Sequence, residues 1–87
     1  MNSIDLGSVE PALRTYLLDL ARKRGADLPA LDRHDPLIER GVFDSMSLLD
    51  FVVFTERLCG IKIPGEDVDP EHFGTLDAIL TYLRGRG

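Results

Sequence analysis

The stretch DSMSLLDFVVFTERLCG, from Asp44 to Gly60, sets the plan of this chain. An Asp followed by Ser is typical of a helix start, because the carboxylate accepts a hydrogen bond from an N–H group of the first turn. A Gly favours a helix end, because it adopts the left-handed conformation without strain. The sequence therefore predicts a helix over residues 45–59 that Asp44 caps and Gly60 ends.

At helical spacing, this predicted helix has two faces of different composition. The inner face carries no charge and is expected to face the core: Leu48, Phe51, Val52, Thr55 and Cys59, with Leu58 at its edge. The outer face mixes apolar and charged residues and is expected to face solvent: Met46, Leu49, Asp50, Val53, Glu56 and Arg57. Exposed apolar side chains ringed by charge indicate a docking site for a partner protein. The alternative is that Met46 and Val53 pack against the preceding loop.

Upstream of this helix, the sequence predicts one more helix and a long loop. Ser8 is expected to cap a helix that runs to about Arg24, with Pro11 in its first turn and Gly25 as its stop. Residues 26–43 contain prolines and a glycine, and one helical turn is expected near residues 36–39. The apolar residues of this loop predict that it packs on the core: Leu28, Leu31, Leu37, Ile38, Val42 and Phe43.

Downstream, an extended segment should direct Ile61 and Ile63 inward. Asp69 is expected to cap a very short helix through Phe73. Thr75 should cap a last helix that Gly85 ends. One apolar stripe marks that helix: Leu76, Ile79, Leu80 and Leu83. The predicted fold is all-α, a small four-helix bundle with three main helices, one short third helix and a long first loop. It forms a single domain over residues 1–87, with its core at about 8–84.

Composition argues against several classes of partner. The net charge of −5 makes nucleic acid an unsuitable partner, because phosphate binding needs an excess of basic residues. Residues 35–71 hold nine acidic and three basic residues, a net of −6. Such a field attracts basic partner surfaces, although it also describes a solvated face that only aids solubility. We expect no membrane insertion, because no apolar run approaches the roughly 20 residues of a span.

Further expectations concern the compartment of the protein. The first ten residues lack the basic and apolar regions of a secretory signal. Cys59 is the only cysteine, so no internal disulfide forms, which fits a reducing compartment. We therefore expect a cytoplasmic protein. We also expect it to act as a monomer.

Ser45 is the residue whose chemistry needs an explanation. A nucleophilic serine needs a base, and the only histidines are His34 and His72, which no motif links to Ser45. We therefore expect no enzymatic activity, and the isolated histidines and Cys59 lack the spacing of a metal site. A hydroxyl at a helix start is instead a favourable place to attach a phosphate, although the charge of Asp44 partly opposes this.

Three segments resemble the carrier proteins of the acyl, aminoacyl and peptidyl type. Asp44-Ser45-Met46 is similar to the family's Asp-Ser-Leu/Met motif. Gly60-Ile61-Lys62-Ile63-Pro64 is similar to the segment that follows the family's second helix. Residues 67–79 resemble the family's third helix and the entry to its fourth. The resemblance covers about residues 8–84.

The resemblance implies a function for Ser45. A phosphopantetheinyl transferase would move 4'-phosphopantetheine from coenzyme A onto Ser45, next to the motif residue Asp44. The terminal thiol of this arm would hold an acyl or aminoacyl group as a thioester. An adenylating acyl or aminoacyl ligase would load it, and downstream acyl-accepting enzymes would dock on the second helix.

Three departures from the fatty-acid type favour a small amino-acid or short acyl cargo. Fatty-acid carriers usually have Gly-Ala or a similar pair before Asp-Ser, whereas this chain has Val42-Phe43. This is closer to D-alanyl and other stand-alone aminoacyl carriers. The second helix also has Arg57 and few glutamates, and Phe51 and Phe54 are expected to fill space that a long chain needs. The alternatives are a fatty-acid or polyketide acyl carrier, or an unmodified helical interaction module of the same fold.

Overall fold

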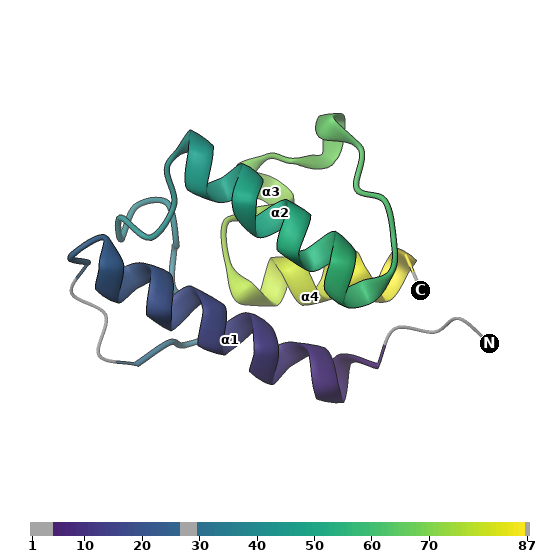
Figure 1. The fold of residues 1–87 in the computed structure, drawn as a ribbon, viewed down its shortest axis with the longest axis horizontal. Coiled ribbons are helices and arrows are strands. Elements are labelled where there is room, and N and C mark those ends of the chain that lie inside the picture. Colours follow the sequence, from purple (N-terminus) through teal and green to yellow (C-terminus); the bar gives the residue numbers. More distant parts are fainter. Residues whose placement is uncertain (1–4, 27–29, 87) are drawn as a thin grey trace.

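The computed structural model describes residues 5–26 and 30–86. Within these residues the chain forms four α-helices: α1 (Leu6–Lys23), α2 (Ser45–Cys59), α3 (Pro70–Phe73) and α4 (Leu76–Arg86). A single 3₁₀ turn, η1 (Gly65–Asp67), precedes α3. The prediction of an all-α bundle with three main helices, a short third helix and a long first loop is confirmed (Figure 1).

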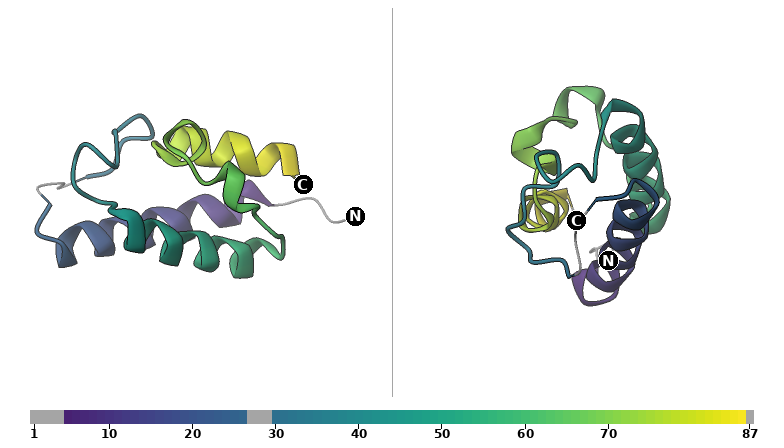
Figure 2. Two further views of the ribbon diagram at one scale, coloured as in Figure 1. Left: turned by 90° about the horizontal axis from the view of Figure 1, so that it is seen from above. Right: turned by 90° about the vertical axis from the view of Figure 1, so that its left-hand side faces the viewer.

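The three long helices pack around one core. α1 and α2 lie side by side and run in opposite directions (Figure 1). α4 covers one face of this pair and contacts α1, and the short α3 packs mainly on α4 (Figure 2). The buried apolar side chains come from all four helices and from the segments before and after α2: Val9, Leu13, Leu17, Ala21, Leu31, Leu37, Val42, Phe43, Phe51, Val52, Ile63, Phe73, Leu76, Ile79, Leu80 and Leu83.

Phe51 lies at the centre of this core and is fully buried. Its ring centre is 5.5 Å from that of Tyr16 on α1 and 5.2 Å from that of Phe43 in the first loop. The ring centre of Phe73 on α3 is 6.4 Å away, in an edge-on arrangement. Tilted and edge-on ring pairs are favourable beyond the area that they bury. Phe51 thus connects α2 to three other parts of the fold.

The first loop is packed on the bundle, as its apolar residues predict. Leu31, Leu37, Val42 and Phe43 are buried, whereas Ile38 is exposed. The Leu37 N–H group donates to the Gly74 carbonyl at 2.8 Å, which ties the loop to the end of α3. The predicted helical turn is present, because the Arg40 N–H group donates to the Pro36 carbonyl at 2.9 Å. Leu28 lies outside the described residues.

Ion pairs add further links between the loop and two helices. Arg33 contacts Glu10 of α1 at 2.7 Å and Asp77 of α4 at 3.9 Å. Arg14 of α1 pairs with Glu10 at 2.8 Å and also donates to the Leu31 carbonyl. These contacts hold the pKa of the Glu10 carboxyl at about 2, mainly through the hydrogen bond from Arg33.

Two helix boundaries differ from the prediction. Asp5, not Ser8, caps α1: its carboxylate accepts from the Gly7 N–H group at 3.1 Å and from the Ser8 hydroxyl at 2.8 Å. α1 therefore starts earlier, and Pro11 lies inside it rather than in its first turn. α4 continues through Gly85 to Arg86. Its end is held by Arg86, which donates to the Lys62 carbonyl at 3.3 Å.

The other predicted caps are confirmed. Asp69 accepts from the His72 N–H group at 2.9 Å, and the Thr75 hydroxyl accepts from the Ala78 N–H group at 3.0 Å. Gly25 and Gly60 end α1 and α2 with φ values of 74° and 69°. Ile63 is buried and Ile61 is half-buried against the core, as expected for the extended segment.

Gly74 at the end of α3 permits a stability prediction. A Cβ atom at this position would lie 2.4 Å from the Pro70 carbonyl oxygen, so an alanine requires the backbone to shift. We expect Gly74→Ala to lower the free energy of unfolding by about 1–3 kcal/mol. Urea denaturation followed by circular dichroism measures this change.

Gly65→Ala is the matched control. A Cβ atom there meets nothing within 4 Å, and Gly65 does not have a positive φ. We expect its stability to be equal to that of the wild type or slightly higher, because alanine restricts the unfolded chain. Equal denaturation midpoints for the two variants would contradict the role assigned to Gly74.

Candidate functional site

A reciprocal cap defines the start of α2. The Asp44 carboxylate accepts from the Ser47 N–H group at 2.8 Å, and the Ser47 hydroxyl accepts from the Asp44 N–H group at 2.8 Å. The Ser47 hydroxyl also donates to the same carboxylate at 2.9 Å. Such a capping box satisfies groups that a helix start otherwise leaves to solvent. The predicted role of Asp44 as helix cap is thereby confirmed.

Arg24, just after α1, ties this cap to the rest of the fold. Its Nη1 atom lies 2.9 Å from the second carboxylate oxygen of Asp44, and its Nε atom donates to the Gly41 carbonyl at 3.0 Å. Both groups are partly exposed, and such pairs add little to stability. The effect of these two contacts is to position the chain, because the Arg24 side chain holds both Gly41 and Asp44, which lead into α2. Local sequence patterns do not indicate this role of Arg24, since the pairing depends on how the loop folds back.

The Asp44 carboxyl is strongly acidic as a result. The hydrogen bonds from Ser47, with a further contribution from Arg24, lower its pKa from 3.8 to about 2. Asp44 is therefore fully ionised at neutral pH. Its negative charge is directly paired with the guanidinium of Arg24 rather than facing solvent alone.

Ser45 is the first residue of α2, and its side chain is exposed. No group within residues 5–26 and 30–86 hydrogen-bonds its hydroxyl. The first-turn N–H groups of a helix carry a partial positive charge. In the described part of the chain, the Asp44 carboxylate accepts a hydrogen bond from the Ser47 N–H group, and the N–H groups of Ser45 and Met46 are left to solvent. The site thus offers an accessible hydroxyl at a positive helix end.

The outer face of α2 is exposed, as predicted. Met46 is 74% exposed, Leu49 56% and Val53 46%, and Asp50 and Arg57 are exposed beside them. The alternative that Met46 and Val53 pack against the preceding loop is wrong, because both side chains are exposed to solvent. An uncovered apolar patch with charged neighbours remains on the surface.

Glu56 has a structural role besides its place on the outer face. Its carboxylate accepts from the Ile63 N–H group at 2.7 Å, and the residue is half-buried. This contact holds the extended segment against the end of α2. A hollow of about 350 Å³ adjoins it, lined by Val53, Glu56, Arg57, Ile61 and Lys62. Ile61 and Lys62 therefore extend the outer face, which helical periodicity within α2 alone does not indicate.

The inner face of α2 faces the core, as predicted. Phe51, Val52 and Thr55 are buried, and Leu48 and Cys59 are half-buried against the same core. The Thr55 hydroxyl donates to the Phe51 carbonyl at 2.8 Å, so this buried polar group is satisfied. Burial raises the pKa of the Cys59 thiol, which is the behaviour of a packed cysteine rather than of an activated one.

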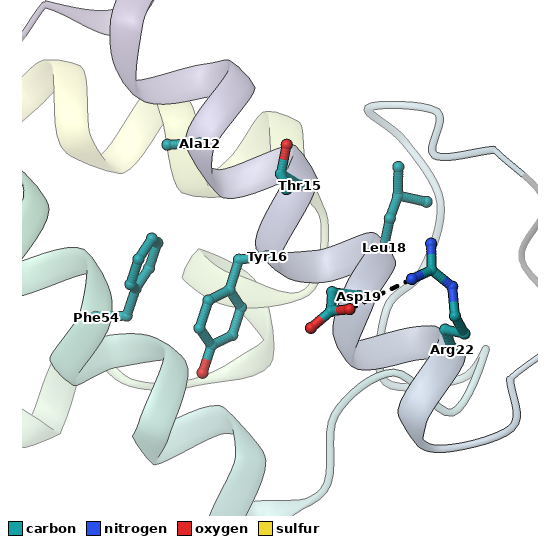
Figure 3. A pocket seen from close by; sticks show the side chains of 7 residues that line it. All are labelled: Ala12, Thr15, Tyr16, Leu18, Asp19, Arg22 and Phe54. Carbon is teal, nitrogen blue, oxygen red and sulfur yellow. Dashed lines mark hydrogen bonds and ion pairs between the residues drawn. The ribbon is translucent and has the colours of Figure 1, made fainter.

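Aromatic rings fill the seam between α1 and α2. The rings of Tyr16 and Phe54 stack with their centres 4.5 Å apart (Figure 3). An open hollow of about 400 Å³ adjoins this pair. In Figure 3, Leu18 and Arg22, which also line it, lie on the side of α1 away from Phe54. This hollow therefore follows the outer surface of α1 and does not lead into the core.

The two histidines lie apart from the start of α2. His34 is exposed in the first loop, and His72 on α3 contacts the Asp69 carboxylate at 2.9 Å. Within the described ranges neither histidine hydrogen-bonds Ser45, and no three His, Cys, Asp or Glu side chains form a group that could hold a metal ion. None of the helices in the described part of the chain has the length and apolarity to cross a membrane.

The Arg24–Asp44 contact leads to a prediction about pH. The ionised cap stabilises the fold fully above pH 3.8, and this contribution is lost as the pH falls toward 2. In Arg24→Gln we expect the pKa of Asp44 to rise toward 3.8 without reaching it, because the hydrogen bonds from Ser47 remain. A carboxyl-carbon NMR titration measures this shift. Arg22→Gln, which removes a contact to Asp19 instead, should leave the Asp44 titration unchanged. Identical Asp44 curves in both variants would contradict the assigned contact.

None of the protein-family models, curated proteins or solved structures compared with this chain matches it. The resemblance to carrier proteins therefore remains a prediction from the motif residues.

Proposed function

We propose that this protein is a carrier that holds an acyl or aminoacyl group as a thioester on a 4'-phosphopantetheine arm attached to Ser45. The observation that carries the proposal is the exposed Ser45 hydroxyl, which has no partner among the described residues and lies at the capped start of α2. In this proposal the protein is not an enzyme. It acts as a monomer in the cytoplasm and presents its cargo to partner enzymes.

The attachment step is a phosphoryl-group transfer catalysed by the partner transferase. The Ser45 oxygen attacks the phosphorus of coenzyme A that bears pantetheine, and a new P–O bond forms. The bond from the attacked phosphorus to the bridging oxygen of the diphosphate breaks, and adenosine 3',5'-bisphosphate leaves with that oxygen. The hydroxyl proton passes to a base on the transferase. This chain contributes an accessible oxygen and a helix start that favours the negative charge of the resulting phosphodiester.

The charge of Asp44 opposes a second negative charge beside it, and Arg24 reduces this opposition. The guanidinium lies 2.9 Å from the Asp44 carboxylate, so the pair brings little net charge to the site. Asp44 is thereby able to cap α2 without repelling the phosphodiester at full strength. This resolves the conflict that the sequence alone presents between the two neighbouring residues.

The packing of the aromatic residues supports a small cargo. A long acyl chain needs an apolar cavity, and Phe51 and Phe54 occupy the positions on α2 that point toward the core and toward α1. Phe51 is fully buried, and its ring packs against those of Tyr16 and Phe43. We therefore favour an amino-acid or short acyl group, supplied by an adenylating ligase, over a fatty-acid or polyketide chain.

Intact-mass measurement tests the attachment. Incubation of the protein with coenzyme A and a broad-specificity phosphopantetheinyl transferase should add one arm to the wild type and none to Ser45→Ala. Ser47→Ala is the matched control: it removes a hydroxyl two residues away whose oxygen already bonds Asp44, and it should still accept one arm. A wild type without an adduct, or an adduct on Ser45→Ala, refutes the proposal.

The outer face of α2 should govern use by the transferase and the ligase. We expect Leu49→Ser and Val53→Ser each to weaken docking by about 1–2 kcal/mol, which corresponds to about a five- to thirtyfold loss of kcat/KM. Leu58→Ser is the control, because Leu58 is 40% exposed at the edge of the inner face rather than on the outer face. Steady-state kinetics of arm transfer measure the effect. Equal losses in all three variants would argue against a specific docking face.

The alternative is an unmodified helical interaction module that uses the same outer face. It is favoured if a partner protein binds Ser45→Ala as tightly as the wild type and no arm is ever acquired.

A further inference from the structure

A small apolar depression lies directly beside Ser45. It has a volume of about 210 Å³, and its lining is predominantly apolar: Ile38, Phe43, Asp44, Ser45 and Leu48. Ile38 is 40% exposed at its rim, and Phe43, only 4% exposed, is the most deeply buried residue of its lining. The depression therefore leaves apolar surface in contact with solvent next to the proposed attachment point.

The local fold explains why Ile38 stands at this place. The Val42 N–H group donates to the Leu37 carbonyl at 2.9 Å, which closes the turn that carries Ile38. Leu37 and Val42 are buried on either side of it, so the turn is anchored by its ends. Ile38 is left outside this anchor, although it is the type of residue that a small core usually buries.

We propose that this depression binds the branched pantoyl part of the arm, an inference that rests on the proposed function. In the arm, a single CH₂ group separates the phosphate on Ser45 from a carbon that carries two methyl groups. These methyl groups are the most apolar part of the arm near its attachment. Because they follow the phosphate so closely, they stay beside Ser45, where the exposed apolar surface lies.

The size and position of the depression fit this occupant. A water molecule takes about 30 Å³ in the liquid, so about 210 Å³ accommodates a compact branched hydrocarbon group. Removing methyl groups and the side chain of Ile38 from water together is favourable. The polar remainder of the arm, with its amides and thiol, extends beyond the depression into solvent.

The binding gives the arm a direction. Leu48 and Met46 are two positions apart on α2, so they point about 200° apart around the helix axis. An arm held against Leu48 and Ile38 therefore leaves the side of Ser45 away from the outer face. The attached arm and a docked partner enzyme do not compete for the same apolar surface.

NMR of the modified protein tests this inference. The arm is transferred from coenzyme A that is ¹³C-labelled in its two pantoyl methyl groups. We expect nuclear Overhauser contacts from these methyl groups to the side chains of Ile38 and Leu48. We also expect methyl shifts that differ from those of free coenzyme A, because the aromatic ring of Phe43 lines the depression. In Ile38→Ser the contacts should be lost and the methyl shifts should move toward those of free coenzyme A.

Leu58→Ser is the control variant. Leu58 is 40% exposed, as Ile38 is, and it does not line the depression, so the methyl contacts and shifts should remain as in the wild type. A wild-type protein that acquires the arm but shows methyl shifts equal to those of free coenzyme A, without contacts to Ile38 or Leu48, overturns this inference alone. A wild-type protein that acquires no arm overturns the proposed function and this inference with it.

Discussion

The contact of Phe51 with the rings of Tyr16, Phe43 and Phe73 is the constraint on which the rest of the structure depends. Each partner ring comes from a different part of the chain: α1, the first loop and α3. A single fully buried side chain therefore sets how α2 is rotated about its axis. With Phe51 pointing inward, helical geometry leaves Met46, Leu49 and Val53 no orientation except toward solvent. The outer face is thus a consequence of the core.

The same constraint places Ser45. Phe43 is held in the core by Phe51, and only Asp44 separates it from the first residue of α2. The chain must turn from a buried position to an exposed one within these residues, and the cap formed by Asp44 and Ser47 completes the turn. Arg24 then fixes Asp44 and Gly41 from the side of α1. Ser45 is exposed at a rigid position because a buried ring lies before it and a capped helix after it.

Much of the fold follows from local sequence signals. Capping residues and glycines bracket α2 and α3, and apolar spacing separates the two faces of α2 and the stripe of α4. The misplaced start of α1 has a local cause as well: Asp5 and Ser8 are both good capping residues, and they bond each other, so spacing alone does not rank them. The extension of α4 past Gly85 depends instead on a contact of Arg86 with the distant Lys62 carbonyl, which no local pattern reveals.

The features of the site that the sequence does not reveal are all contacts between distant segments. From the sequence, Arg24 is interpreted as a basic residue suited to a helix end, and Ile38 as one of several apolar residues of a packed loop. Only the folded loop brings Arg24 to Asp44 and leaves Ile38 exposed beside Ser45. Two distinct surfaces then meet at one serine: a charged and apolar face on α2 suited to proteins, and a small apolar depression suited to a compact group. The proposed carrier function uses both surfaces, the outer face of α2 for a partner enzyme and the depression for the first part of the arm.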